Sequence, residues 1–462
     1  MVLLNREGDS PLYLQLYEII KGEILEGSRK EGEKLPSLRA MAAQMGTGIN
    51  TVKEAYILLE GEGYIMAREK RGFFVNPVAH LVKLKDASTA RIPREQPHVY
   101  PYDFGYSGVD PDSFPFTVWR RVFTEALATG DVGLLRSGDP QGELFLRQTL
   151  REYLRESRGI ETTADHIVIS AGTEHLYGIL RRILPENLRY GFEDPGYPWG
   201  LRYFTHNLTG PIPLPVDQWG VRVEDLEWEA VDICLITPAH QFPLGFTMPV
   251  GRRIELLNYA ARSKHHYIIE DDYDAELNFK GRVVPTLKSL DNADKVVFVG
   301  SFSKLLTPAL RISYMVLPDE LLQRYRKFMK GYNCPVSLFV QKALATFIAQ
   351  GHFQRHVNRM RQRGKKKYQL MKEKLETLPG LTILGDEGNT AFVVSVEVAD
   401  GEKFLQDCRA AGVKVTDINR FRYRPKEATE LLLSFSSMSL DAIEEGLSVL
   451  GQVIDANKEE KL

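Results

Sequence analysis

The feature of the sequence that most constrains its fold is an alternation of short apolar runs and helical segments after residue 103. The apolar runs are rich in β-branched residues and lie at residues 166–170, 233–236, 266–269, 295–299 and 312–317. Between several of them, apolar residues recur at helical spacing. Chains with this alternation form largely parallel sheets, which bind ligands at the carboxyl ends of their strands. The pattern therefore predicts an α/β domain whose chemistry lies just after its strands.

Length and composition are those of a globular protein without membrane segments. The 462 residues are enough for roughly two to four domains, and 43% of them are apolar and 26% charged. No apolar run approaches the ~20 residues that span a bilayer, and Arg6, Glu7 and Asp9 argue against a signal peptide. We therefore expect a cytoplasmic protein. The three cysteines are far apart and odd in number, which predicts neither disulfides nor a metal site.

Residues 300–311, with the sequence GSFSKLLTPALR, follow one of the predicted buried strands. They offer the hydroxyls of Ser301 and Ser303, the amine of Lys304 and the guanidinium of Arg311. A lysine at the end of a buried strand, beside groups that bind phosphate, suits a Schiff base to pyridoxal phosphate. The alternative is a strand-to-helix loop that carries a surface lysine, and this stretch alone does not separate the two.

Two further stretches carry groups that suit the same cofactor. Gly172 and Thr173 form a small-residue turn into a helix, where backbone N–H groups and the helix dipole attract phosphate. Tyr197 lies on a tight turn at residues 193–198, where its ring could stack on another ring. A tyrosine in a turn is also a common packing residue, so Tyr197 alone does not identify a cofactor site.

More polar groups follow the next two strands. Residues 237–245 form a rigid loop with His240 and Gln241, and Asp271 and Tyr273 come directly after the strand at 266–269. An aspartate in this position suits the ring nitrogen of pyridoxal phosphate, but it is also a common helix cap. The order of the parts along the chain, from phosphate turn to tyrosine, polar loop, carboxylate, lysine and arginine, favours the cofactor site.

Residues 10–75 predict a compact unit of three helices and a two-stranded hairpin. Ser10 and Ser37 are placed to cap the first two helices, and Gly46 to end the second. Two short helices joined by a tight glycine turn are typical of a helix-turn-helix. The basic hairpin tip at residues 68–71 would then form a wing.

In such a unit the front of the third helix enters the major groove of DNA. Asn50, Thr51 and Lys53 would be presented there, and Arg39 would reach phosphate. The alternative is a small helical domain with ordinary surface charges. Residues 1–76 hold ten basic and eleven acidic side chains, a net charge of −1 that gives DNA binding little support.

Four blocks in register resemble the winged helix-turn-helix of the GntR family. They are residues 35–39 (LPSLR), 50–56 (NTVKEAY), 59–64 (LEGEGY) and 71–75 (RGFFV). The resemblance implies that six residues face double-stranded DNA: Arg39, Asn50, Thr51, Lys53, Arg71 and Gly72. One position departs from the family, because Gly48 and Ile49 stand where a polar or basic pair is usual. This departure bears on the operator sequence and not on the fold.

Periodicity stops at residues 77–102, where prolines and mixed charges are frequent. A stretch of this length without an element is uncommon inside a domain, so it predicts a linker. The chain is thus predicted to have a DNA-binding domain at 1–76, the linker at 77–102 and a large domain at 103–462. Within the large domain, strands near 390–398 and 430–435 predict a smaller α+β portion after a long helical region.

From about residue 103 to residue 452, the order of the strand-end groups resembles the fold type I aminotransferases, which bind pyridoxal 5′-phosphate. The resemblance implies that Lys304 forms the internal aldimine with the cofactor. It also implies that Asp271 pairs with the protonated ring nitrogen and that Tyr273 donates to the phenolic oxygen.

The same resemblance assigns the remaining cofactor contacts. Tyr197 would stack on the ring, and His240 or Gln241 would make a polar contact near it. The phosphate would be held by Gly172, Thr173, Ser301, Ser303 and Arg311, with Arg311 forming a charge-assisted fork.

A GntR-type domain, a linker and an aminotransferase-like domain in one chain resemble the MocR/GabR family of bacterial transcription regulators. Residues 138–142 (GDPQG), 158–160 (RGI) and 303–311 fit that family. The resemblance implies a head-to-tail homodimer and an amino-compound effector that meets bound pyridoxal phosphate. The large domain would then serve sensing, with no catalytic residue.

Two departures concern the effector. The family usually has Arg-Leu-Gly-Phe near the C-terminus, where the arginine clamps a substrate carboxylate, but here Leu432 takes its place. The usual Gly-Leu-His before the preceding strand is replaced at residues 389–392 (NTAF). Losing a carboxylate partner weakens the binding and orientation of an α-amino acid. Arg420, Arg422 or Arg424 could substitute from a nearby loop.

Three functions therefore stand side by side. The first is a regulator in which an amine or amino acid displaces Lys304 from the cofactor and changes DNA binding. The second is a working aminotransferase that also binds DNA, which the missing clamp arginine disfavours. The third is a sensor of pyridoxal phosphate itself that controls vitamin B6 synthesis.

Overall fold

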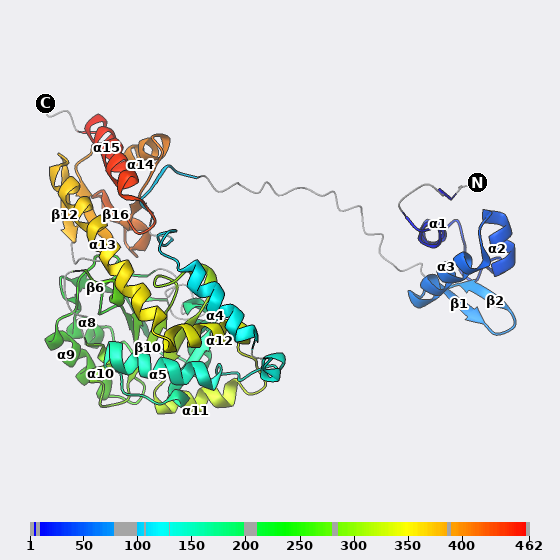
Figure 1. Ribbon diagram of the computed structural model, residues 1–462, viewed down its shortest axis with the longest axis horizontal. Helices are drawn as coiled ribbons and strands as arrows, with labels where there is room; N and C mark the ends of the chain where they lie inside the picture. Colours follow the sequence, from blue (N-terminus) through cyan, green and yellow to red (C-terminus); the bar gives the residue numbers. More distant parts are fainter. Residues whose placement is uncertain are drawn as a thin grey trace. The chain divides into compact units, whose positions relative to one another are not determined.

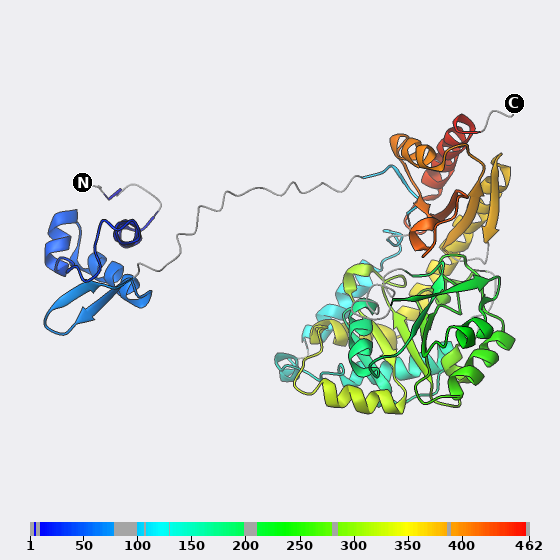
Figure 2. The same cartoon turned by 180° about the vertical axis from the view of Figure 1, so that it is seen from behind.

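The computed structural model describes most of the chain, in two compact units. The described residues are 4–5, 10–77, 99–105, 108–128, 130–197, 210–279, 285–385 and 390–458. The units are Met1–Pro97 and His98–Leu462, each with its own core (Figures 1 and 2). Most of the predicted linker, residues 77–102, lies outside the described ranges, so the domain boundaries remain a prediction.

The first unit contains three helices and a hairpin. Its elements are α1 (Leu12–Leu25), α2 (Leu38–Met45), α3 (Ile49–Gly61), β1 (Ile65–Arg68) and β2 (Gly72–Val75), with the two strands antiparallel. Their apolar faces share one core, which includes Leu16, Ile20, Val52, Tyr56 and Leu59. The unit is the winged helix-turn-helix that the sequence predicts.

Local signals place the ends of α2 as predicted. Ser37 Oγ accepts a hydrogen bond from Ala40 N at 3.2 Å and caps the helix. Gly46 takes a left-handed φ of +62°, which ends α2 and turns the chain toward α3. At the start of α1 the prediction is wrong, because Pro11 is the cap residue and no side chain caps the helix.

The second unit is built on an eight-stranded sheet with the order β4-β11-β10-β9-β8-β5-β6-β7. The strands are β4 (Ile167–Ser170), β5 (Tyr190–Asp194), β6 (Ile212–Asp217), β7 (Gly220–Val221), β8 (Ile233–Ile236), β9 (Tyr267–Asp272), β10 (Val296–Ser301) and β11 (Ser313–Val316). Strands β10, β9, β8, β5 and β6 run parallel to one another. Strand β11 is antiparallel to both β10 and β4, and β7 is antiparallel to β6. The predicted α/β class is confirmed, although the sequence pattern missed β5, β6 and β7.

Helices cover both faces of the sheet. They are α4 (Phe116–Ala128), α5 (Leu144–Arg158), α6 (Thr173–Ile183), α8 (Val223–Trp228), α9 (Val250–Ala261), α10 (Leu287–Leu290), α11 (Asp319–Phe328), α12 (Leu338–Ala349) and α13 (His352–Thr377). Successive strand residues point to opposite faces, so Ile169 and Phe298 pack with α4, α5, α12 and α13, while Val168 and Val297 pack with α6 and α11. None of the described helices has the length and apolar content to cross a membrane.

The smaller α+β portion follows α13. Its antiparallel sheet has the order β12-β13-β16-β15, and α14, α15 and the C-terminal half of α13 pack against it. The elements are β12 (Leu381–Gly385), β13 (Ala391–Val396), α14 (Gly401–Ala410), β14 (Val413–Lys414), β15 (Thr416–Asp417), β16 (Glu430–Ser434) and α15 (Leu440–Ala456). Strand β14 pairs in parallel with β3 (Tyr102–Asp103), so the chain enters the second unit through this portion.

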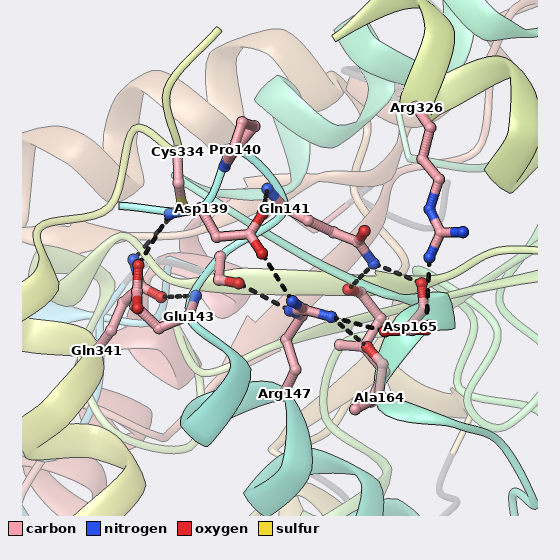
Figure 3. Close-up of polar contacts among 12 residues, drawn as sticks. Asp139, Pro140, Gln141, Glu143, Arg147, Ala164, Asp165, Arg326, Cys334 and Gln341 are labelled. Carbon is pink, nitrogen blue, oxygen red and sulfur yellow. Dashed lines mark hydrogen bonds and ion pairs between the residues drawn. The ribbon is translucent and has the colours of Figure 1, made fainter. Parts of the chain in front are cut away.

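A polar network holds the loop of residues 138–142 against the edge of the large sheet (Figure 3). Arg147 on α5 is buried, and its Nε donates to Gly142 O at 2.7 Å and its Nη1 to Ala164 O at 2.9 Å. Its Nη2 pairs with Asp139 Oδ2 at 2.8 Å. Gln141 Nε2 donates to Asp165 O, just before β4, and to Ile167 O, in the first residue of β4. The Arg147 guanidinium therefore ties the loop to α5 and to the residues just before β4, and Gln141 ties it to β4 itself.

Replacing this guanidinium should destabilise the second unit strongly. Arg147→Met leaves two backbone carbonyls without their donor and removes the ion pair with the part-exposed Asp139, and we expect the free energy of unfolding to fall by about 2–3 kcal/mol. Arg151→Met, on the exposed side of α5, should change it by less than about 0.5 kcal/mol. All four tryptophans follow residue 98, so their fluorescence during urea unfolding reports this unit alone. Equal effects of the two variants would contradict the anchoring role.

Candidate functional site

A cavity of about 170 Å³ lies at the carboxyl edge of the large sheet. Strand β9 brings Asp271 to it, β10 brings Ser301, β8 leads into Thr237, and α6 begins with Thr173. Because β9 and β10 are parallel neighbours with Val299 opposite Asp271, their ends reach the cavity together. The sheet thus gathers polar groups that are far apart in the sequence.

One group of lining residues offers donors to an anion. Thr173 opens α6 after Gly172, whose φ of +95° turns the chain from β4 into the helix. Ser301, Ser303 and Arg311 line the same cavity. Free backbone N–H groups at a helix start, hydroxyls and a guanidinium together suit a phosphate group. The structure therefore brings together the five residues predicted to hold phosphate.

Arg311 is already placed by two neighbours. Its Nη2 lies 2.7 Å from Glu174 Oε2, and its guanidinium packs on Gly172. A Cβ on residue 172 would come within 2.9 Å of Arg311 Cζ, so glycine is required by space as well as by its φ. Glu174 was not predicted, and it gives the guanidinium a partner in the protein itself.

Asp271 is a buried carboxylate with one oxygen held and one unpartnered. Tyr177 on α6 donates its hydroxyl to Asp271 Oδ2. Asp271 Oδ1 has no hydrogen-bond partner among the described residues. Burial raises the pKa of Asp271 to about 6, while the Tyr177 hydrogen bond opposes that shift. The carboxylate is thus fixed in place and ready to accept one further hydrogen bond.

Lys304 supplies the amine of the cavity. Loss of water around the amine lowers the pKa of Lys304 to about 8, and the charge of Asp274 works against that shift. A lysine with this pKa has a far larger neutral fraction near neutral pH than an ordinary lysine. Because only the neutral amine is nucleophilic, the position suits covalent attachment of an aldehyde.

Three aromatic rings line the same cavity in an edge-to-face chain. Phe242 lies between Tyr197, at a centroid distance of 5.9 Å, and Tyr273, at 6.0 Å. Burial raises the pKa of the Tyr197 hydroxyl well above its usual value. Tyr197 and Tyr273 are therefore both placed at the cavity as predicted, whereas Phe242 was not singled out from the sequence.

His240 and Gln241 do not line this cavity in the described part of the chain. His240 Nδ1 lies 2.9 Å from Asp274 Oδ1 and 2.8 Å from the Tyr273 hydroxyl. Gln241 Nε2 donates to Pro195 O at 2.9 Å and to Phe242 O at 2.7 Å. Both side chains hold neighbouring groups in place, while Thr237 and Phe242 line the cavity. A contact of His240 or Gln241 with the cofactor ring remains a prediction.

The position of the missing clamp arginine is apolar. Leu432 is buried in a cluster with Phe242, Val393 and Ile418. Arg422, the predicted substitute, is committed to an ion pair with Glu430 and has only 7% of its side chain exposed. It lines neither this cavity nor the adjoining one beside Lys304. Glu430 thus neutralises the charge of Arg422 within the smaller portion, and a contact of Arg422 with the effector remains a prediction.

Two of the unpredicted residues left a trace in the sequence. Tyr177 follows Thr173 by four positions, and this spacing puts both on one face of α6. Asp274 follows Asp271 in the same acidic run. Its charge raises the pKa of Lys304 against the effect of burial, and its carboxylate forms a hydrogen bond with His240. Glu174 and Phe242 have no such signal, since their contacts depend on how the strand ends come together.

The residues predicted to face DNA lie on the outside of the first unit. Asn50 and Lys53 are exposed at the front of α3, and Thr51 between them is half-buried. Arg39 is exposed on α2, and Arg71 and Gly72 lie at the hairpin tip. Each is therefore available to a partner, and their contact with DNA remains a prediction.

The residues present in the cavity fit pyridoxal phosphate. The unpartnered Asp271 Oδ1 suits the ring N–H, and the donors around Gly172 suit the phosphate. Lys304 offers a neutral amine for the aldehyde. This donor set needs a ligand with an anion, a protonated ring nitrogen and an electrophilic carbon, all of which the cofactor has.

Comparisons with known proteins agree with both units. The model for bacterial regulatory proteins of the gntR family matches residues 12–75, and the model for aminotransferase class I and II matches residues 106–450. The structure is similar to a kynurenine aminotransferase of Pyrococcus horikoshii, with a TM-score of 0.70 and 26% identity over 78% of this chain and 92% of that one. The second unit is therefore a fold type I domain, whose cofactor is pyridoxal phosphate.

Curated relatives match across both units. The chain is 36% identical to YdeL, an uncharacterized HTH-type transcriptional regulator of Bacillus subtilis, over 97% of each chain. It is 33% identical to the probable rhizopine catabolism regulatory protein MocR of Rhizobium meliloti, over 78% of this chain and 76% of the relative. The chain therefore belongs to the MocR-type transcriptional regulators, in which a gntR-family DNA-binding domain precedes an aminotransferase class I and II domain.

Proposed function

We propose that this regulator senses a primary amine through Lys304 and bound pyridoxal phosphate, and that the bound amine changes its affinity for DNA. One observation carries the proposal: Lys304, whose pKa burial lowers to about 8, lines the same cavity as Asp271, whose Oδ1 has no hydrogen-bond partner among the described residues. The clamp position is an apolar leucine. The site is thus equipped to hold the cofactor and to exchange amines on it. It lacks the arginine on which an aminotransferase depends to orient its substrates.

The side chains divide the work of holding the cofactor. Bound pyridoxal phosphate supplies an aldehyde that condenses with amines and a ring that withdraws electrons. Asp271 keeps the ring nitrogen protonated, and Tyr177 holds Asp271 by its other oxygen. Lys304 supplies the amine with which an effector's amine competes. Arg311 and the start of α6 anchor the phosphate end, so that exchange at Lys304 leaves the cofactor in place.

The assembly and location are further parts of the proposal. The second unit exposes large apolar side chains at the start of α4 and after its end, with Phe116 70%, Val132 67% and Leu135 81% exposed. Exposed apolar groups of this size favour burial against another protein surface. This supports a homodimer, head-to-tail as the family resemblance implies, acting on DNA in the cytoplasm.

Replacing Lys304 tests the sensing site directly. Lys304→Ala should abolish the absorption band of lysine-bound pyridoxal phosphate, because the attaching amine is gone. Lys295→Ala, just before β10 and outside the cavity, should keep the band. Difference spectra of the purified full chain with added cofactor measure both. Retention of the band in Lys304→Ala would rule out this lysine.

Two further experiments, an assay of keto acid production and a measurement of operator binding, separate the alternatives. Sustained keto acid production by the wild-type chain from any amino donor would contradict a purely sensing domain. Operator binding that responds to pyridoxal phosphate alone, with no effect of amines, would favour the sensor of cofactor level that controls vitamin B6 synthesis. The apolar environment of Leu432 leads us to expect no sustained keto acid production.

The DNA-facing residues should separate into two kinds. Arg71→Ala should weaken binding to all sequences and reduce the salt dependence of log K by about 1, as expected for a phosphate contact. Asn50→Ala should weaken operator binding and leave non-specific binding nearly unchanged, as expected for a base contact. Lys21→Ala is the control, because Lys21 pairs with Glu62 beyond the far end of α3. Fluorescence anisotropy at several salt concentrations would measure all three.

A control variant that weakens binding as much as Arg71→Ala would show that only net charge matters. That result would contradict the docking of the wing and of the front of α3 on DNA.

A further inference from the structure

The first residue of α3 is an isoleucine that the first unit does not use in its core. Ile49 is 47% exposed, whereas Val52, Tyr56 and Leu59 on the same helix are fully buried. A single exposed apolar side chain is common on a protein surface and needs no explanation by itself. Ile49 differs in its place, because it begins the helix that a unit of this kind inserts into the major groove of DNA.

The neighbours of Ile49 show what this end of α3 offers to a partner. Asn50 and Lys53 are exposed beside it, with Lys53 one helical turn further along. Within its described first turn, α3 has no acidic side chain, so the positive end of the helix dipole is open to DNA phosphates. Ile49 is therefore exposed on the face that the first unit presents to DNA.

Gly48, just before Ile49, is not required by the fold of the first unit. Its φ of −75° is accessible to any residue, and among the described residues a Cβ on it would meet only Thr51 Oγ1, at an ordinary 3.8 Å. As the N-cap of α3 it also forgoes the side-chain cap that a serine or threonine would supply. A glycine that fills no tight space and costs a cap suits a backbone that a ligand approaches closely.

The charge of the first unit gives base contacts a large share of the binding. Residues 1–76 carry a net charge of −1, so phosphate neutralisation contributes less than in a strongly basic domain. Gly48 and Ile49 offer DNA neither a charge nor a side-chain hydrogen bond. In the major groove, the base-edge group that an apolar side chain can recognise is the methyl group of thymine.

We propose that Ile49 packs against the methyl group of a thymine in the major groove and makes the operator depend on that base. The inference rests on one part of the proposed function, the docking of the front of α3 on DNA. Ile49 supplies the apolar surface, and Gly48 lets the backbone come close enough for the contact. The amide of Asn50 suits adenine, so these neighbours together favour A·T base pairs under the front of α3.

Exchanging thymine for uracil removes the methyl group alone and tests the contact. The probe is the DNA upstream of the protein's own gene, prepared once with thymine and once with uracil, and the protein is the cofactor-loaded full chain. We expect the wild type to bind the thymine DNA at least about fourfold more tightly, the effect of burying one methyl-sized group. Fluorescence anisotropy measures both affinities. Because the lost group is uncharged, the salt dependence of log K should be the same for the two DNAs.

Two isoleucines on one helix give a matched pair of variants. Ile49→Ala should bind both DNAs with nearly the affinity that the wild type has for uracil DNA, because the methyl group has lost its partner. Ile57→Ala should keep the wild-type preference, since Ile57 is also exposed, at 54%, but lies about two turns further along α3. The wild type and Ile49→Ala on the two DNAs form a double-mutant cycle, which removes any wider effect of uracil on the DNA.

The outcomes separate this contact from DNA binding itself. Equal wild-type affinity for the two DNAs, or a thymine preference that Ile49→Ala retains, overturns the contact and leaves DNA binding intact. A preference that Ile57→Ala also loses overturns it as well, because the effect would then not depend on the place of the isoleucine. No binding of the wild type to the upstream DNA, with or without amines, overturns the proposed function together with this inference. A preference that only Ile49→Ala loses supports the assignment.

Discussion

The site depends on the parallel pairing of β9 and β10. This pairing places Asp271 beside the strand that leads to Lys304, although the two residues are far apart in the sequence. It also withdraws both groups from water, which raises the pKa of the carboxyl and lowers that of the amine. Removal from water favours the neutral form of each group. A neutral amine is what covalent attachment of an aldehyde requires, and the bound cofactor would restore the charge partner of Asp271.

Two cavities border Lys304. One contains the groups that suit the cofactor, and the other contains cations and an unpaired hydroxyl that the cofactor does not need. In an aminotransferase a clamp arginine would hold the substrate acid, but the equivalent Leu432 packs with Phe242 and Val393.

Much of the α/β fold and of the cavity lining could be predicted from the sequence, because the carboxyl ends of parallel strands meet at one edge of a sheet. Strand-end residues such as Thr173, Asp271 and Ser301 were found in that way, and the structure gathers them. Strands β5 and β6 were missed because β5 contains charged residues and β6 contains prolines, and β7 was missed because it has only two residues. The pairing of Tyr177 with Asp271 and of Arg422 with Glu430 depends on tertiary contacts that no local pattern encodes. His240 and Gln241 were placed in the correct loop but not at the cavity.

The central claim is that an amine which replaces Lys304 on the cofactor controls DNA binding. The most direct test is the affinity of the cofactor-loaded full chain for the DNA upstream of its own gene, with and without amino carboxylates, in the wild type and in Lys304→Ala. The account predicts that at least one amino carboxylate changes the wild-type affinity by about fivefold or more and leaves that of the variant unchanged. The same change in both proteins, or no change with any amine, would contradict it.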